Sequence, residues 1–481
     1  MKIFKNFLYN SSYQLLAVVI PLVTSPYISR VLEPEGVGLS TITYSSVQYF
    51  VLVATLGTLT YGNREIAYYQ KDKIRRSQAF WGINFLSWIT SGIAILSFLV
   101  FISFIKEYKE LYLWQGVAIL ASMFDISWYF MGMERFKVTV VRNFIFKILT
   151  MFAIFIFVHR ATDLWIYIAI LSLGTLGSSL SLWPYLKDEV LIPDFKNLEL
   201  KRHFKYTLAL FIPTITVQIY AALNRNMIGA FDSVIHAGFF DQSDKIIKIS
   251  LSLVTSLGVV MLPRVANLHA RGDVKSIHKL FQKTFDLVSG ISICLMFGVL
   301  AISLKFAPFF FGKGYSLVGP IMMIESPVIV FTTWGVIFSN QYLVPLNRLR
   351  PLTTSVVIGT IFNILANLLL IPLIGVMGAT INITLSEFII SYYKYFSIRK
   401  EFKLRELFEG IWKYLFSGMV MFLIVFMMNQ TFKMNALQLL LQLVVGVISY
   451  SLLNILLKTQ LWVMFRRLLQ QRKAKTKISI D

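Results

Sequence analysis

The sequence predicts an all-α polytopic membrane protein of about 14 transmembrane helices, and three observations support this. The chain of 481 residues is 56% hydrophobic and 15% charged, with a mean hydropathy of +0.68. Apolar runs of about 20 residues, the length that crosses a bilayer, recur along the whole chain. Lysine and arginine gather in every second connection between these runs. Because a soluble protein of this size cannot bury so much apolar surface, much of that surface must face lipid.

The fourteen predicted spans are apolar segments joined by connections of at most about 20 residues, which leave no room for a soluble catalytic domain. They lie near residues 7–29, 40–62, 80–104, 110–132, 143–158, 163–185, 205–228, 246–263, 284–304, 318–344, 352–371, 375–396, 410–428 and 436–457. The basic tail after residue 457 is expected to lie on the anionic inner leaflet.

The charge distribution tests this count. The net charge is +22, from 46 basic and 24 acidic residues. If the N-terminus is inside, 36 of the 46 basic residues fall in inner segments and 8 in outer ones, and the remaining two open the eighth span. This is the positive-inside pattern rather than a nucleic-acid surface. It predicts an even number of spans, both termini in the cytoplasm and no nucleic-acid partner.

An internal repeat suggests two lobes. Similar basic segments begin at Arg64 and Arg264, 200 residues apart, after the second and the eighth span. Parallel duplication about an axis along the membrane normal is an architecture known from transporters. We therefore expect an N-lobe over 1–195 with spans 1–6, a C-lobe over 196–400 with spans 7–12, and a third part over 401–481 with spans 13 and 14 and the tail.

Motifs for soluble chemistry are missing from the sequence. Cys294 is the only cysteine, which excludes an intramolecular disulfide and a cysteine metal site. The five histidines lack metal-ligand spacing, and no phosphate-binding loop or nucleophile elbow occurs. We expect no catalytic residue, metal or cofactor.

Polar residues inside spans one, seven and eight are the strongest candidates for a site, because polar groups at membrane depth usually face a cavity or a partner. If these spans line one lumen, it is cationic and suits a phosphate and sugar hydroxyls. The alternative is that they snorkel or pair locally, for instance Lys245 with Asp241 or Asp244. The substrate-binding candidates are Arg30, Gln218, Asn224, Arg225, Lys245 and Lys248.

Other polar and helix-breaking residues have structural or coupling interpretations. Asp125, Glu134 and Arg142 surround the inner end of span four, where an ion-pair cluster is expected. Glu325 and Glu387 lie within spans, as a proton or cation site or as protonated acids. Proline interrupts spans one and seven at matching positions of the two halves, which makes Pro21, Pro26 and Pro213 hinge candidates.

Four stretches of the chain resemble the bacterial polysaccharide flippases of the multidrug/oligosaccharidyl-lipid/polysaccharide exporter superfamily. The opening stretch matches through Pro26, Tyr27, Arg30, Gly36, Gly38, Tyr49, Phe50, Gly57, Tyr61, Gly62, Arg64 and Glu65. The other three match through Asp125, Trp128, Gly132, Glu134, Phe136, Arg142 and Asn143, through Gly229 and Gly238, and through Asn363, Asn367, Pro372, Gly375, Gly378 and Glu387. The likeness covers nearly the whole chain.

The resemblance implies two lobes around a central cavity, with spans 13 and 14 outside, in a bacterial cytoplasmic membrane. It implies a flippase that moves undecaprenyl-pyrophosphate-linked oligosaccharide units from the inner to the outer leaflet by alternating access, for capsule, exopolysaccharide or a teichoic-acid-like polymer. It adds Arg64 to the substrate-binding candidates. Membrane lipids and other polysaccharide assembly proteins are the expected partners, and the coupling ion, H⁺ or Na⁺, stays open.

Two positions depart from the family pattern. Glu33 and Pro34 stand where a glycine is usual after span one, and Asn224 stands where an acidic residue is common. The alternative functions are a drug/cation antiporter of the same superfamily and a non-transporting scaffold or enzyme of polysaccharide assembly. An antiporter needs a cation-binding acid in the early spans, yet no Asp or Glu precedes Glu33.

Overall fold

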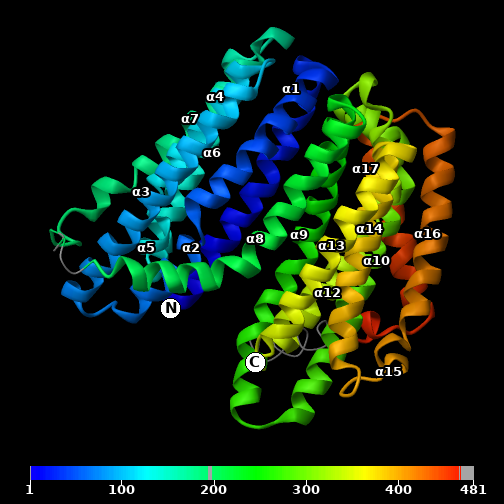
Figure 1. Ribbon diagram of the computed structural model, residues 1–481. Coiled ribbons are helices and arrows are strands. Elements are labelled where there is room, and N and C mark those ends of the chain that lie inside the picture. The colour runs from blue at the N-terminus through cyan, green and yellow to red at the C-terminus, as the bar shows by residue number, and fades with distance from the viewer. Residues whose placement is uncertain (1, 193–194, 196–197, 465, 467–481) are drawn as a thin grey trace, which may run out of the picture. The chain divides into compact units, whose positions relative to one another are not determined.

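The computed structural model describes residues 2–192, 195, 198–464 and 466, and for the helical residues 2–18, 212–217, 221, 255–264, 266 and 270 it describes the backbone alone. Helices dominate these residues, and no strand occurs among them (Figure 1). The helices are α1 (Lys2–Thr55), α2 (Thr58–Tyr68), α3 (Lys73–Phe104), α4 (Lys109–Met123), α5 (Ser127–Gly132), α6 (Phe136–Phe157), α7 (Leu164–Leu180), α8 (Leu200–Phe231), α9 (Val234–Ala270), α10 (Val274–Phe311), α11 (Val318–Glu325), α12 (Val328–Phe338), α13 (Leu349–Ile374), α14 (Val376–Ile398), α15 (Leu404–Phe408), α16 (Ile411–Thr431) and α17 (Ala436–Leu456).

Each of the fourteen predicted spans falls on helical segments, which confirms the all-α membrane fold. Nine helical segments among the described residues are long and apolar enough to cross a bilayer, from Val19–Tyr68 to Ala436–Leu456. The first two predicted spans share α1, where the chain is helical except at Glu33. The number 14 itself stays a prediction.

The break in α1 has a clear local cause. Glu33 has φ 59° and ψ 173°, and Pro34 follows it. A proline disfavours helical geometry in the residue before it, and this combination of angles is one that glycine alone adopts readily. Pro21 and Pro26 lie within helical backbone on one side of this break. The kink is therefore at the position where the family resemblance expected a glycine.

Chain contacts divide the protein into two compact units, Met1–Gly238 and Phe239–Asp481. In the first unit, α1 packs on α3, α4, α6 and α8, while α4 packs on α7. Its aromatic core gathers Tyr61, Phe80, Trp128 and Tyr129, all nearly inaccessible to solvent. These contacts group α8 with the first unit, whereas the sequence assigns residues 196–231 to a C-lobe, and the lobe boundaries stay a prediction.

The second unit is built around α10. That helix packs on α11, α12 and α16, and α16 packs on α17. Phe281, Phe285, Phe338 and Phe402 fill the interior between them. Beside this core, α13 and α14 pack on each other as an antiparallel hairpin joined at Gly375.

Glycine permits one unusually close approach in the first unit. A methyl group on Gly38 of α1 would lie 2.3 Å from the Val234 carbonyl oxygen at the start of α9. A methyl group on Gly238, one turn along, would lie 2.9 Å from the Gly38 backbone. Any larger side chain at either position would force the two helices apart. Both glycines belong to the family resemblance, which this packing explains.

Candidate functional site

In the first unit, polar side chains of α1 and α8 meet. The Ser46 hydroxyl donates to Asn226 Oδ1 at 3.1 Å, and Asn226 Nδ2 donates to the Tyr49 hydroxyl at 3.2 Å. Two positions before Asn226, Asn224 is fully buried, and Arg225 between them is half-buried. The predicted polar stretch of span seven is thus packed on span two. Asn226 was not among the predicted site residues.

Other candidates of this unit are exposed. Arg30 lies on the open side of α1, where its Nη1 donates to the Pro26 carbonyl at 3.5 Å. Gln218 on α8 is also exposed. Exposed arginine and amide groups at these depths need water or a polar ligand. That Arg30, Gln218 and Arg225 share one lumen stays a prediction.

In the second unit, α9 pairs its cations with its own acids. Lys245 Nζ lies 2.8 Å from an Asp241 carboxylate oxygen, and Lys248 Nζ lies 2.6 Å from one of Asp244. Both pairs join residues four apart, as helix geometry favours. The local-pairing alternative therefore describes Lys245 and Lys248. The positive charge that they were expected to offer to a phosphate is largely neutralised.

The buried acids of this unit lie near the same helix. Glu325 on α11 is fully buried and accepts a hydrogen bond from the Ser243 hydroxyl of α9. Glu387 on α14 accepts from the Thr332 hydroxyl of α12 at 2.8 Å. Lys394, Lys248 and Asp244 all act electrostatically on Glu387. Helices α9 and α14 thus bring two cations and two acids close together, with Asp244 and Lys394 buried and Lys248 exposed.

Lys394 is the member of this cluster that sequence reasoning missed. It is 9% exposed on α14, and its Nζ lies 3.5 Å from the Gly335 carbonyl oxygen. The residue falls two positions before the predicted end of span twelve, so it was counted with the inner basic segment. Its spacing of seven residues from Glu387, two helical turns, is the signal that could have linked the two.

The predicted ion-pair cluster of span four is used for local structure. Asp125 accepts from the Ser127 backbone N–H at 2.9 Å and so begins α5. Arg142 on α6 donates to the Ser178 carbonyl of α7 at 2.8 Å and to Asn143 Oδ1. Glu134 occupies the turn before α6 with φ 54°. The contacts of Asp125 and Arg142 support a structural role.

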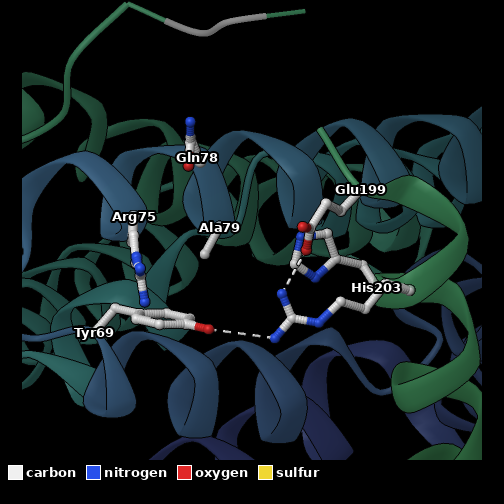
Figure 2. Close-up of a pocket in the computed structure, with 7 residues that line it drawn as sticks. Tyr69, Arg75, Gln78, Ala79, Glu199 and His203 are labelled. Carbon is white, nitrogen blue, oxygen red and sulfur yellow. Dashed lines mark hydrogen bonds and ion pairs between the residues drawn. The ribbon is translucent and has the colours of Figure 1, made fainter. Parts of the chain in front are cut away.

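A cavity of about 290 Å³ lies at the predicted inner face of the first unit, between the start of α3 and the start of α8 (Figure 2). Arg202 is one of the residues that line it and contacts three nearby side chains. One guanidinium nitrogen lies 2.8 Å from Glu65 Oε1 of α2, and another contacts Glu199. The Tyr69 hydroxyl accepts from Arg202 at 3.4 Å. These contacts join the first turn of α8, and Glu199 just before it, to the end of α2. The sequence alone did not predict them.

His203 forms the buried floor beside Arg202. Its Nδ1 lies 2.8 Å from the Tyr61 hydroxyl, and the ring packs against Gly82, where a methyl group would lie 2.6 Å from Nε2. Burial first, and then the positive charge of Arg202, lower the pKa of His203 to about 4. The ring is therefore neutral at pH 7. On the same helix as Tyr61, the exposed Arg64 has its guanidinium carbon 5.8 Å from the Tyr61 ring.

The hinge candidates are all in helical backbone. Pro21 and Pro26 lie in α1. Pro213 lies in α8 at a position outside the described side chains. Whether they bend during a transport cycle stays a prediction.

Comparison with known proteins identifies the family. A family model described as "Polysaccharide biosynthesis protein" matches residues 3–269, more than half of the chain. The chain belongs to this polysaccharide biosynthesis protein family. The matched region covers α1 to α8 and nearly all of α9, and so includes the Ser46–Asn226 contact, the Arg202 cavity and the α9 ion pairs.

Two relatives extend the family match along the chain. A putative O-antigen transporter of Escherichia coli (strain K12) is 21% identical over 396 residues, which is 80% of this chain and 94% of that protein. A probable low-salt glycan biosynthesis flippase, Agl15 of Haloferax volcanii, is 21% identical over 194 residues, 40% of each chain. The resemblance to polysaccharide flippases is confirmed at the level of the family.

Solved structures share the fold of this polysaccharide biosynthesis protein. The lipid II flippase MurJ in an inward closed conformation aligns with a TM-score of 0.75 at 14% identity, covering 97% of this chain and all of that one. An inward-facing multidrug resistance MATE transporter aligns with a TM-score of 0.59 at 14% identity, covering 81% of this chain and 94% of its own. The fold is therefore that of the predicted superfamily.

Proposed function

We propose that the protein is a flippase for lipid-linked oligosaccharide repeat units, with undecaprenyl pyrophosphate as the lipid carrier and capsule, exopolysaccharide or a teichoic-acid-like polymer as the product. One observation carries the proposal: the chain aligns with a putative O-antigen transporter over 94% of that protein's length. The family match and a fold shared with a lipid II flippase point the same way.

Moving a charged lipid-linked sugar across the membrane requires the kinds of residue that the proposed path contains. A diphosphate with sugars cannot cross the hydrocarbon core alone, because it would lose its hydration. Its isoprenoid tail can stay in lipid while the head passes through a polar path. Arg30 and Arg225 supply positive charge for the phosphates, and Gln218 and Asn226 supply hydrogen bonds for sugar hydroxyls, whereas Asn224 is fully buried.

Alternating access would move the head from the cytoplasmic to the outer leaflet, and a ligand or ion that prefers one arrangement sets the direction. The buried acids Glu325 and Glu387 are the candidates for coupling to H⁺ or Na⁺. Their hydroxyl partners, Ser243 and Thr332, come from neighbouring helices, α9 and α12. A change of protonation there would alter contacts between helices rather than within one.

The test is transport by the purified full-length protein in liposomes. A lipid-diphosphate-oligosaccharide is placed in both leaflets, and the fraction of head groups that an added enzyme can reach outside is followed with time. We expect protein-dependent exposure of the inner pool. No exposure, with or without a proton or sodium gradient, would contradict the proposal. Cation-driven dye efflux by the same liposomes would then favour the antiporter, whose fold the chain shares.

Arginine variants locate the path. Arg30→Ala and Arg225→Ala should each slow head-group exposure at least about tenfold, because each removes a charge that pairs with phosphate. Lys433→Ala, in the connection between α16 and α17, is the matched control and should keep wild-type transport. Equal transport by all three variants at equal protein level would exclude the cationic path. Loss of transport in Arg225→Ala with normal membrane level would also count against a scaffold.

A further inference from the structure

A second pocket lies on the second unit, between the start of α13 and the end of α14. Every charged residue among those that line it is a cation. Its volume is about 360 Å³. Arg350 at the start of α13 and Arg399 and Lys400 just after α14 line it, and all three are exposed. No acidic residue is among the described residues that line it. Glu401, which follows Lys400 in the sequence, has a carboxylate oxygen 2.6 Å from Arg348 Nη1.

The pocket is a shaped site rather than a loose group of charges. The Arg399 guanidinium stacks over the Phe396 ring with 3.7 Å between its central carbon and the ring centroid, which fixes that side chain. Thr354, Tyr393 and Ser397 add hydroxyl groups to the wall. Three cations beside hydroxyl donors match the oxygens of a phosphate ester.

An apolar surface leads away from this pocket along the same hairpin. On α14, Phe388, Tyr392 and Phe396 are 43%, 53% and 43% exposed. Their rings follow one another at centroid distances of 5.9 Å and 6.5 Å. On α13, Ile361, Leu365 and Leu369 are 54%, 59% and 67% exposed. Because α13 and α14 are antiparallel, the α14 row leads away from the pocket at Phe396, and the α13 row lies farther along in the same direction.

The two features together describe one ligand. We propose that this pocket binds the head group of an anionic phospholipid of the inner leaflet, with its acyl chains along the exposed faces of α13 and α14. The positive-inside pattern puts the 345–351 and 394–413 segments on the cytoplasmic side, where anionic lipids face basic groups between helices. A lipid is favoured over a soluble anion because the site continues into an apolar face. None of the residues that line it is among those proposed for the transport path.

Binding of fluorescent phosphatidylglycerol, compared with phosphatidylcholine of the same chains, tests this in full-length protein in detergent micelles. We expect the wild-type protein to bind phosphatidylglycerol at least about tenfold more tightly. The variant Arg350→Gln/Arg399→Gln/Lys400→Gln should lose that preference. Lys71→Gln/Lys201→Gln/Lys205→Gln is the control, because it removes the same charge from exposed inner-face positions of the first unit and should keep the preference.

The other possible results of the binding experiment decide for or against the lipid site. An unchanged preference in the pocket variant would overturn the proposal. Equal loss in both triple variants would also overturn it, because the attraction would be due to general charge. Displacement of the lipid by glycerol phosphate at millimolar concentration would mark a soluble-anion site and reject the lipid. If the triple variant fails to fold, Arg350→Gln/Lys400→Gln keeps the Arg399–Phe396 stack and should still weaken the preference severalfold. These results do not depend on flipping activity.

Discussion

At the residue scale, the charges within the spans of the second unit occur with partners. On translocon scales a lone Asp, Lys or Arg at the membrane centre costs about 2.5–3.5 kcal/mol. The Lys248–Asp244 pair and the Glu387–Thr332 hydrogen bond reduce that cost. Such charges persist because they hold helices in register or take part in transport.

Glu33 allows a direct stability test. Its backbone angles, φ 59° and ψ 173°, cost a non-glycine residue about 1–3 kcal/mol. We expect Glu33→Gly to stabilise the protein by about 1 kcal/mol, because the greater freedom of glycine in the unfolded chain offsets part of the gain. The measurement is the thermal unfolding midpoint of purified protein in detergent.

Glu35 is the matched control for this substitution. It is also exposed, lies two residues further along and has helical backbone. Glu35→Gly should destabilise the protein by up to about 1 kcal/mol, as glycine does in a helix interior. If both variants lower the midpoint equally, the kink at Glu33 is not strained.

His203 predicts a pH dependence of stability. Its pKa is about 4 in the folded protein and about 6.5 in an unfolded chain. Above pH 6.5 both states hold a neutral ring. As the pH falls from 6.5 toward 4, only the unfolded state takes up the proton, so stability falls by about 1.4 kcal/mol per pH unit. The variant His203→Gln should therefore lose about 2 kcal/mol less than wild type between pH 6.5 and pH 5.

Unfolding midpoints at the two pH values measure this difference. His159, exposed and hydrogen-bonded near the outer end of α6, provides the control, and His159→Gln should follow the wild-type pH dependence. Identical curves for His203→Gln and wild type would mean that His203 is not held neutral.

Sequence reasoning at this scale succeeded where partners are close along the chain. The spacing of Lys245 and Asp241 indicated, as one alternative, the ion pair that the structure contains, although the Lys248–Asp244 pair was not named. It failed where partners are distant: Tyr61 and His203 are 142 residues apart. Nothing local in the sequence marks such a contact, because only the folded chain brings α2 beside α8.

At the element scale, the α13–α14 hairpin is held by buried amides. Asn382 Nδ2 donates to Asn367 Oδ1 at 2.6 Å and to the Asn363 carbonyl at 2.7 Å, and all three side chains are fully buried. Asn382→Ala would remove this buried amide donor from both acceptors. We expect a loss of about 1–3 kcal/mol of stability, read as a lower thermal midpoint.

Two further variants test the network. Leu385→Ala changes a half-exposed lipid-facing residue on the same helix and should cost less than Asn382→Ala. The double variant Asn367→Ala/Asn382→Ala should lose less than the sum of the single losses, because both remove the same hydrogen bond. Strict additivity would show that the amides act independently.

Hydropathy predicted where helices occur but not where they break. The fourth span divides into α4 and α5 at Asp125, and the tenth into α11 and α12 at Pro327. Both breaks have a local cause, a carboxylate that accepts from the first backbone N–H of the next helix and a proline without a donor. A window of about 20 residues averages over such single positions, so it reports one span where the chain makes two helices.

At the scale of the whole molecule, the alternating charge pattern carries information that single helices do not. It depends on every span being counted, since one wrong span would reverse the sides of all later segments. The two-lobe division and the 200-residue repeat rest on weaker sequence signals. Contacts group α8 with the first unit, where it packs on α1, α3 and α2, and its predicted inner end is tied to α2 through Arg202 and His203.

The topology can be mapped chemically because Cys294 is the only cysteine. Cys294→Ser gives a cysteine-free background, and it should fold since the side chain is small and lies in the α10 core. Single cysteines then replace Lys71, Lys275, Lys109 or Lys433. We expect a membrane-impermeant maleimide to label positions 109 and 433 in intact cells, and positions 71 and 275 only after the membrane is opened. Because the four positions lie in both halves of the chain, a miscounted span between two of them would reverse the side on which the later position is labelled. Labelling of position 433 only in opened cells, with 109 labelled in intact ones, would mean an odd number of spans between the two. If position 275 were then also labelled in intact cells, the miscounted span would precede it and the basic pocket of α13 and α14 would lie on the side opposite to the anionic leaflet.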